Sequence, residues 1–505
     1  MQQARAAVDP AFVVAPVGRR LFGSFVEHMG RCVYTGIYEP GHPSADDDGF
    51  RGDVLDLVRE LGVTTVRYPG GNFVSGYRWE DGVGPAERRP TRLDPAWRTV
   101  ETNAFGLDEF VRWAARAGVE PMMAVNLGTR GVQEALDLLE YANHPGGTTL
   151  SDLRVAHGSP QPHGIRLWCL GNEMDGPWQL GHKTAQEYGR LAAETARAMR
   201  QLDPDLELVA CGSSSRDMPT FGAWEATVLE HAHDVVDYVS AHAYYQLHGD
   251  DRASFLASSV DMDRFIDQVV ATVDHVGARL GSDRRIDISF DEWNVWYLQE
   301  WQAQEVAPTS EWQVAPRRSE DAYTVLDAVV VGSLLITLLR HADRVTAASQ
   351  AQLVNTLSLI RTEPGGPAWR QATFHPFALT ARHATGTVLD LRLTAPALTT
   401  QRYGEVPVLD AVATHDVDER RLTVLVVNRH PSEPVALTTG LRGFGGGTLL
   451  EAVVLTDDDL TATNTQDDPH RVEPREHPHA AVVDGELVAQ LPPASWSMFV
   501  LQVDG

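Results

Sequence analysis

Cysteine is scarce in this chain of 505 residues: Cys32, Cys169 and Cys211 are the only three, and they stand far apart. An odd number of cysteines without a C-x-x-C pair argues against both a disulfide framework and a structural zinc site. His231 and His233 form an isolated pair, and no H-E-x-x-H motif occurs. We therefore expect no metal site.

Long apolar runs are also missing. The longest, from Ala328 to Leu339, has 12 residues and is bounded by Asp327 and Arg340. That length is too short to span a bilayer and favours a buried helix. The first residues, MQQARAAVDPAFVVAPVGRRL, contain no apolar segment of signal-peptide length behind a basic start. These two features predict a cytoplasmic protein that has no membrane partner.

Positive charge is in short supply as well. The 42 Lys and Arg residues are outnumbered by 69 Asp and Glu residues, so the formal net charge is −27. A nucleic-acid partner requires basic surface and is therefore excluded. An anionic polysaccharide would be repelled too, and a neutral ligand fits better. The 12 Trp and 12 Tyr residues offer flat faces that suit sugar rings.

The apolar runs that are present are short and recur along the first three quarters of the chain. Each ends in polar residues and is followed by a stretch with helical spacing, as in Gly49–Gly62, Gly106–Gly118 and Thr184–Leu202. Thr184 and Glu187 have the spacing of a capping box. The eight runs lie near Leu21, Thr64, Glu120, Ile165, Leu206, Val235, Arg285 and Arg344.

Eight such alternations predict an α/β fold, a (β/α)8 TIM barrel over residues 20–376, with an open doubly wound sheet as the alternative. From about Phe377 the sequence changes to short β-rich segments such as VPVLDAVATHD, RRLTVLVVNRH, GTLLEAVVLT and ASWSMFVLQVD. These segments, separated by turn residues, are typical of an all-β sandwich. Residues 377–505 are therefore predicted to form a second, all-β domain.

Two glutamates follow barrel strands at the end where reactive residues gather. Glu173 follows the fourth run and Glu292 the seventh, which face each other across the predicted barrel mouth. Two carboxyl groups that flank one bond are the apparatus of glycoside hydrolysis: one protonates the leaving group and the other attacks. A separation of about 5–5.5 Å would give retention of configuration. Glu173 and Glu292 are thus the predicted catalytic residues, and this chemistry needs no cofactor.

Other polar residues at the strand ends could read sugar hydroxyls. Asn172 could donate to a hydroxyl beside the reacting carbon, and Tyr244 could orient the nucleophile. Simpler interpretations stay open, since Arg67 could form only a salt bridge, His242 could be structural and Trp97 could be core. The candidates for binding hydroxyls are Glu27, Arg67, Asn72 and Gln352, and those for packing on sugar faces are Trp97, Trp178, Trp293 and Trp296.

Six stretches together resemble the α-L-arabinofuranosidases of glycoside hydrolase family 51, in the expected order from Leu21 to Asn355. They are LFGSFVEHMGRCVYTGIYEP, VRYPGGNFVSGYRWEDGVGP, WCLGNEMDGPWQLGHKTAQEYG, SAHAYY, DEWNVWY and AQLVN. The resemblance implies a retaining hydrolase that releases terminal α-L-arabinofuranosyl groups. It makes Glu173 the acid/base and Glu292 the nucleophile. The positions it assigns to the arabinose subsite are Glu27, Arg67, Asn72, Asn172, His242, Tyr244 and Gln352.

The same resemblance implies three further features. Residues 1–19 are expected to join the β-sandwich, and the protein is expected to be a homo-oligomer, since members of the family are often hexamers. The segment Leu298–Arg318, rich in Gln and Glu, is expected to be a loop that affects the choice of leaving group.

Three alternatives remain at this stage. A retaining β-xylosidase or endoglucanase would use the same barrel and glutamate pair, and aryl glycosides of arabinofuranose and xylose would separate them. A catalytically dead, sugar-binding barrel would be indifferent to loss of Glu173 and Glu292. A structural or interaction protein would have no reason for so many polar strand ends.

Overall fold

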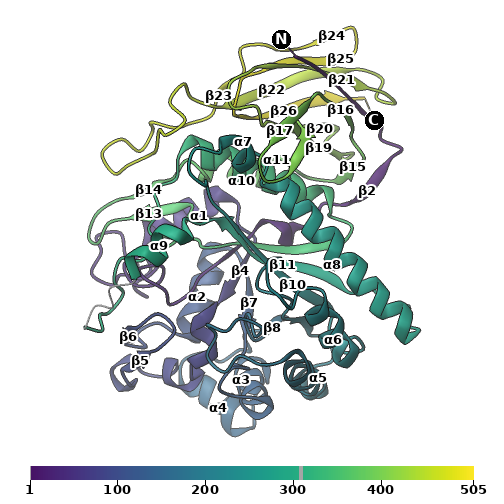
Figure 1. Cartoon of the computed structure of the whole chain (residues 1–505). Coiled ribbons are helices and arrows are strands. Elements are labelled where there is room, and N and C mark those ends of the chain that lie inside the picture. The colour runs from purple at the N-terminus through teal and green to yellow at the C-terminus, as the bar shows by residue number, and fades with distance from the viewer. Residues whose placement is uncertain (1, 306–310, 505) are drawn as a thin grey trace.

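The computed structural model describes residues 2–305 and 311–504. Figure 1 shows a barrel with a β-sandwich on one side of it, and both ends of the chain lie in the sandwich. The eight barrel strands are parallel to their neighbours and close into a ring. The predicted TIM barrel is therefore confirmed. Its strands are β3 (Gly23–Phe25), β4 (Thr65–Tyr68), β7 (Glu120–Ala124), β8 (Leu167–Leu170), β9 (Glu207–Ala210), β10 (Tyr238–Tyr245), β11 (Asp287–Val295) and β12 (Val345–Gln350).

The three predicted amphipathic helices are present as α1 (Gly52–Leu61), α2 (Leu107–Ala117) and α5 (Ala185–Leu202). The capping box of α5 is formed: the Glu187 carboxylate accepts a bond from the Thr184 amide at 2.9 Å. The other α-helices are α3 (Val132–Asn143), α4 (Thr149–Ala156), α6 (Ala223–Ala232), α7 (Arg252–Leu256), α8 (Ser259–Leu280), α9 (Leu298–Glu305), α10 (Val325–Arg340) and α11 (Phe374–His383). Short 3-10 helices are η1 (Arg19–Phe22), η2 (Asn72–Gly76), η3 (Trp79–Gly82) and η4 (Ala86–Arg88).

Helix α10 contains the longest apolar run and is buried from Val325 to Leu339, as predicted. In the two described stretches of the chain, no helix has the length and apolar character needed to cross a membrane. Helix α9 corrects one expectation, because the first eight residues of the segment Leu298–Arg318 form this helix rather than a loop. Residues 306–310 of the same segment lie outside the described residues.

The sandwich has a seven-stranded and a five-stranded sheet. The two N-terminal strands enter different sheets: β1 (Gln2–Val8) pairs in parallel with β21, and β2 (Val13–Pro16) pairs with β15. The larger sheet has the order β2, β15 (Thr387–Leu389), β19 (Leu409–Asp416), β20 (Arg421–Asn428), β26 (Ser495–Val503), β22 (Gly447–Leu455), β23 (Arg475–Glu476). The smaller has the order β16 (Arg392–Thr394), β1, β21 (Val435–Leu441), β25 (Glu486–Leu491), β24 (Ala480–Val483).

Three small hairpins stand apart from these sheets: β5–β6 (Arg92–Asp94 and Thr99–Glu101), β13–β14 (Ile360–Thr362 and Ala368–Arg370) and β17–β18 (Ala397–Thr400 and Gly404–Pro407). The β17–β18 hairpin belongs to the C-terminal part of the chain but touches the barrel. The amides of Gln401 and Arg402, in its turn, both donate to the Ser254 hydroxyl of α7 at 3.1 Å.

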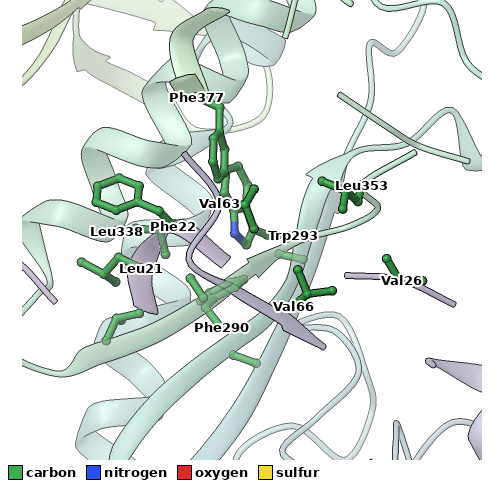
Figure 2. Packing of buried hydrophobic residues seen from close by; sticks show 14 of the residues in the cluster. Leu21, Phe22, Val26, Val63, Val66, Phe290, Trp293, Leu338, Leu353 and Phe377 are labelled. Carbon is green, nitrogen blue, oxygen red and sulfur yellow. The ribbon is translucent and has the colours of Figure 1, made fainter. Parts of the chain in front are cut away.

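The barrel wall and its surrounding helices share one apolar core. Figure 2 shows Phe22, Phe290 and Trp293 in this core, together with Phe377 of α11. Trp293 has no exposed surface, so the expectation that it packs on a sugar face is wrong. Strand β11 thus sends Trp293 outward into the core, while neighbouring residues face the barrel interior.

Candidate active site

The two predicted catalytic glutamates lie together at the barrel mouth. Glu292 belongs to β11, and Glu173 sits in the turn that follows β8, with a positive φ of 44°. Their exposed fractions are 6% and 9%, so both carboxyl groups are largely removed from solvent. A carboxylate oxygen of Glu173 lies within 4.8 Å of one of Glu292. This short spacing belongs to the range in which the second carboxylate attacks directly.

Both oxygens of Glu292 are held by donors from other strands. Arg67 of β4 donates through Nη1 to Oε1 at 2.8 Å, and the Tyr244 hydroxyl of β10 donates to Oε2 at 2.8 Å. Burial raises the pKa of Glu292, and Glu173 raises it further, whereas His242, Arg67 and the Tyr244 hydrogen bond act to lower it. The carboxylate is thereby fixed in position by one donor to each oxygen, and each oxygen keeps a further lone pair.

Glu173 has a different set of partners. The indole nitrogen of Trp178 donates to Oε2 at 2.8 Å, and Nδ1 of His242 lies 2.9 Å from Oε1. The other ring nitrogen of His242 lies 2.9 Å from Asp291. Burial alone would lower the pKa of His242, but the carboxylates of Glu292, Asp291 and Glu173 raise it well above its usual value. His242 thus bridges Glu173 and Asp291, and its Nδ1 also lies 3.7 Å from Glu292 Oε2.

Asp291 is a site residue that the sequence analysis did not assign. It is buried, accepts from His242, and lies 3.6 Å from the sulfur of Cys169. Neighbouring residues of a regular strand point to opposite faces, which would turn Asp291 away from Glu292. The pairing of β11 with β10 and with β12 shifts register around these residues, and such bulges re-aim side chains. The adjacent acidic pair in DEWN was the available signal.

Arg67 does more than form a salt bridge. Its Nη2 donates to Asn172 Oδ1 at 2.7 Å, and the Asn172 amide lies 3.4 Å from Asn72 Oδ1. Arg67 is 1% exposed, and its guanidinium donates to both Glu292 and Asn172. It therefore fixes the positions of these two side chains relative to each other. The amides of Asn172 and Asn72 are thus oriented beside the nucleophile.

Glu27 is the centre of a second group of hydrogen bonds. Its carboxylate accepts from the Phe73 amide at 2.9 Å, Trp97 Nε1 at 2.9 Å and Gln352 Nε2 at 3.1 Å. Burial raises the pKa of Glu27 to about 8, although the Phe73 amide opposes this. Gly71 leaves room for it: a Cβ at Gly71 would lie 2.4 Å from Glu27 Oε2.

These groups border a cavity of about 510 Å³, within the usual size of a small-molecule site. The structure brings twelve of the thirteen predicted site residues to it, Trp293 being the exception: Arg67, Asn172 and His242 are buried and do not line the space, and the other nine do. These nine are Glu27, Asn72, Trp97, Glu173, Trp178, Tyr244, Glu292, Trp296 and Gln352.

Glu173, His242 and Glu292 are also close enough together to share a metal ion. Their hydrogen bonds explain this closeness without one. Both ring nitrogens of His242 already face carboxylates, and the guanidinium of Arg67 supplies positive charge beside Glu292.

A closed (β/α)8 barrel with two buried glutamates on one cavity has the form of a glycoside hydrolase. Comparison with known proteins identifies the family. Residues 57–266 match the model described as "Alpha-L-arabinofuranosidase 1 domain", and residues 291–495 match "Alpha-L-arabinofuranosidase C-terminal domain".

Full-length relatives agree. The chain is 60% identical to an "Intracellular exo-alpha-(1->5)-L-arabinofuranosidase" of Streptomyces lividans, over 98% of this chain and 75% of the relative. It is 56% identical to an "Exo-alpha-(1->6)-L-arabinofuranosidase" of Bifidobacterium longum, over 98% and 97%. A solved family 51 α-L-arabinofuranosidase of Bifidobacterium longum superposes with a TM-score of 0.95, at 49% identity and 99% coverage of both chains. The chain belongs to the α-L-arabinofuranosidases of glycoside hydrolase family 51, which confirms the resemblance.

Proposed function

We propose that the chain is a retaining, exo-acting α-L-arabinofuranosidase. Its substrates are neutral arabino-oligosaccharides or fragments of arabinan and arabinoxylan, from which it removes terminal non-reducing arabinofuranosyl groups. The observation that carries the mechanism is that one carboxylate oxygen of Glu173 and one of Glu292 lie within 4.8 Å of each other, because so short a gap suits direct attack, whereas an inverting enzyme needs a wider gap for its water.

In the first step Glu292 attacks the anomeric carbon while Glu173 gives its proton to the departing oxygen. The bond to the leaving group breaks as the bond to Glu292 forms, which leaves a covalent arabinosyl-enzyme. Arg67 and Tyr244 support this role of Glu292, since they hold its two oxygens in place. Trp178 supports the role of Glu173, since its indole hydrogen bond fixes the carboxyl group.

In the second step Glu173, now ionised, takes a proton from a water molecule that attacks the same carbon. Glu292 departs, and arabinose leaves with its original configuration. His242 supports the change of state at Glu173 because its ring lies 2.9 Å from that carboxyl group. No metal or organic cofactor enters either step.

The arabinose subsite is proposed to consist of Glu27, Asn72, Asn172 and Gln352, with Trp97 and Trp296 beside them. Glu27 and Gln352 contact each other on the cavity wall. The side-chain oxygen of Gln352 has no hydrogen-bond partner among the described residues, so it is available to accept from a sugar hydroxyl.

Three further features are proposed: the location of the enzyme, its oligomeric state and its division into domains. The enzyme is intracellular, as the names of its relatives state for those proteins. It is a homo-oligomer, and a hexamer is the form to test first by light scattering. Residues 20–376 form the catalytic unit, and residues 1–19 with 377–505 form the sandwich, which the pairing of β1 and β2 with C-terminal strands supports.

The test is hydrolysis of 4-nitrophenyl α-L-arabinofuranoside by wild type, Glu173→Ala and Glu292→Ala, each with and without azide. We expect azide to restore turnover of Glu173→Ala and to give the α-configured arabinosyl azide, because azide attacks the covalent intermediate. Glu292→Ala should form no such retained product. Wild-type cleavage of the aryl β-xyloside in preference to the arabinoside would refute the substrate, and an α-azide from Glu292→Ala would refute the assignment of the nucleophile.

A further inference from the structure

The cavity is lined by more side chains than the catalytic chemistry requires. One group of them, called here the second end, takes no part in the reaction described above. The residues that line this end are Ser214, Ser215, Asp217, Gln246, His248, Asp251, Arg402 and Tyr403. Arg402 and Tyr403 come from the β17–β18 hairpin of the C-terminal part, and the others come from loops after β9 and β10.

The two ends are physically continuous. Ser214 donates through its amide and its hydroxyl to Asp175, two residues beyond Glu173. The loop that carries Asp217 therefore starts at the wall beside the acid/base residue. Because Glu173 protonates the leaving group, the part of the substrate that departs must lie on this side.

Trp178 marks the exit. The residue is 52% exposed although its indole nitrogen is hydrogen-bonded to Glu173. The indole lies against Gly176, where an added Cβ would come within 2.6 Å of it. The sugar next to the cleaved bond would pass this ring, and a following sugar would reach the second end.

The hairpin turn is held firmly at that point. Both the Gln401 and Arg402 amides donate to the Ser254 hydroxyl, which is 2% exposed, and the Tyr403 amide donates to Thr400 Oγ1 at 3.0 Å. The backbone of Arg402 is thus fixed while its side chain is exposed. Over residues 2–305 and 311–504, the Arg402 guanidinium takes part in no recorded hydrogen bond or ion pair.

The chemistry of this end suits a neutral polyol. Arg402 offers donors, while Asp217 and Asp251 offer acceptors, so charges of both signs are present. Burial, reinforced by Arg402 and opposed by Asp251, lowers the pKa of His248, which favours the neutral ring. A strongly anionic ligand would meet the two carboxylates, and a cation would meet the guanidinium, whereas hydroxyl groups can bond to both kinds of side chain.

We propose that this second end binds the third sugar residue of the substrate, counted from the non-reducing terminus, and that Arg402 of the β17–β18 hairpin is its main determinant. The inference rests on the proposed function. It makes the C-terminal part of the chain a contributor to substrate selection in addition to its role in the fold.

The experiment compares kcat/KM for 4-nitrophenyl α-L-arabinofuranoside, arabinobiose and arabinotriose in wild type, Arg402→Ala and Arg402→Lys. Arg442→Ala serves as the matched control, since Arg442 is an exposed arginine of the same domain that does not line the cavity. For the wild type we expect arabinotriose to exceed arabinobiose about tenfold, the effect of one charge-assisted hydrogen bond. Arg402→Ala should remove this advantage through KM and leave the aryl glycoside and arabinobiose unchanged, and Arg402→Lys should retain part of it.

Equal kcat/KM for arabinobiose and arabinotriose in the wild type would overturn the inference, as would an equal loss on all three substrates in Arg402→Ala. An effect of the same size in Arg442→Ala would overturn it too. These outcomes leave the proposed function intact, provided that the wild type cleaves the aryl arabinofuranoside. If the wild type does not cleave that substrate, the proposed function fails, and this inference fails with it.

Discussion

The hydrogen bond from Tyr244 to Glu292 gives a sharp test of how the nucleophile is held. Tyr244→Phe removes only the hydroxyl, which donates to Glu292 Oε2 at 2.8 Å. The ring should stay in place because it packs edge-on against Trp296, with 5.1 Å between the ring centroids. Within the described part of the chain, Arg67 then remains as the single hydrogen-bond donor to this carboxylate.

The magnitude follows from the charge of the acceptor. A hydrogen bond to an ionised group contributes about 1.5–3 kcal/mol, so its loss should lower kcat/KM by about 10- to 150-fold. The pH profile should change as well. The Tyr244 hydrogen bond lowers the pKa of Glu292, so its removal raises that pKa. Since the nucleophile must be ionised to attack, the acid limb of kcat/KM should move to higher pH.

Tyr238→Phe is the matched control. Tyr238 lies at the start of the same strand, β10, and donates to Glu207 at 2.9 Å, so the variant loses a Tyr–Glu hydrogen bond away from the cavity. Both variants are assayed with 4-nitrophenyl α-L-arabinofuranoside across the acid range, with thermal unfolding measured in parallel. If Tyr244→Phe keeps both the wild-type rate and the wild-type acid limb, this hydrogen bond does not position Glu292. If Tyr238→Phe loses as much activity, the effect is one of general stability.

Three further perturbations test other parts of the structure. Gly71→Ala should lower kcat/KM at least about tenfold because the new Cβ would meet the Glu27 carboxylate at 2.4 Å; Gly281→Ala, also at positive φ but in open space, should keep full activity. Burial raises the pKa of Glu27 to about 8, so wild-type kcat/KM should fall above that pH, where Glu27 ionises beside Glu292. The Glu27→Gln variant should lack this fall. Alkaline pH profiles of wild type and variant that superimpose would contradict the prediction. Asp410→Asn should cost about 3–5 kcal/mol of stability by removing the carboxylate that pairs with the buried guanidinium of Arg429, seen as a lower unfolding midpoint, and an unchanged midpoint would refute that role.

The barrel was predictable from the sequence because each parallel strand is buried on both faces and reads as a short apolar run. The polar residue at the end of each run then marks the barrel mouth. Asn172 and Glu173 follow β8 after a single residue, Gly171, and Arg67 lies within β4, so strand order predicts their convergence. Helix α5 was equally predictable, since its N-terminal cap is a local interaction between Thr184 and Glu187, three residues apart.

Other features depend on contacts that no local pattern contains. The role of Asp291 requires irregular pairing on both sides of β11, whereas regular alternation would have turned Asp291 away from Glu292. Trp178 and Trp97 are predicted to pack on sugars, and the structure adds that their indole nitrogens donate to Glu173 and Glu27. An aromatic side chain in a sequence does not reveal whether its face or its N–H group is used.

The position of the β17–β18 hairpin depends on how the sandwich is attached to the barrel. Asp410 of β19 is 1% exposed and accepts bonds from Arg429 of the sandwich at 2.6 Å, from Ser333 of α10 at 2.8 Å, and also from Arg340 of α10. A buried carboxylate is tolerated only when such partners are all in place, so this cluster favours one arrangement of the two parts. Gly332 strengthens the constraint, because even a Cβ there would lie 2.2 Å from Trp496 of β26. A sandwich fixed in this way can hold Arg402 at the barrel mouth, which a flexibly tethered domain could not do.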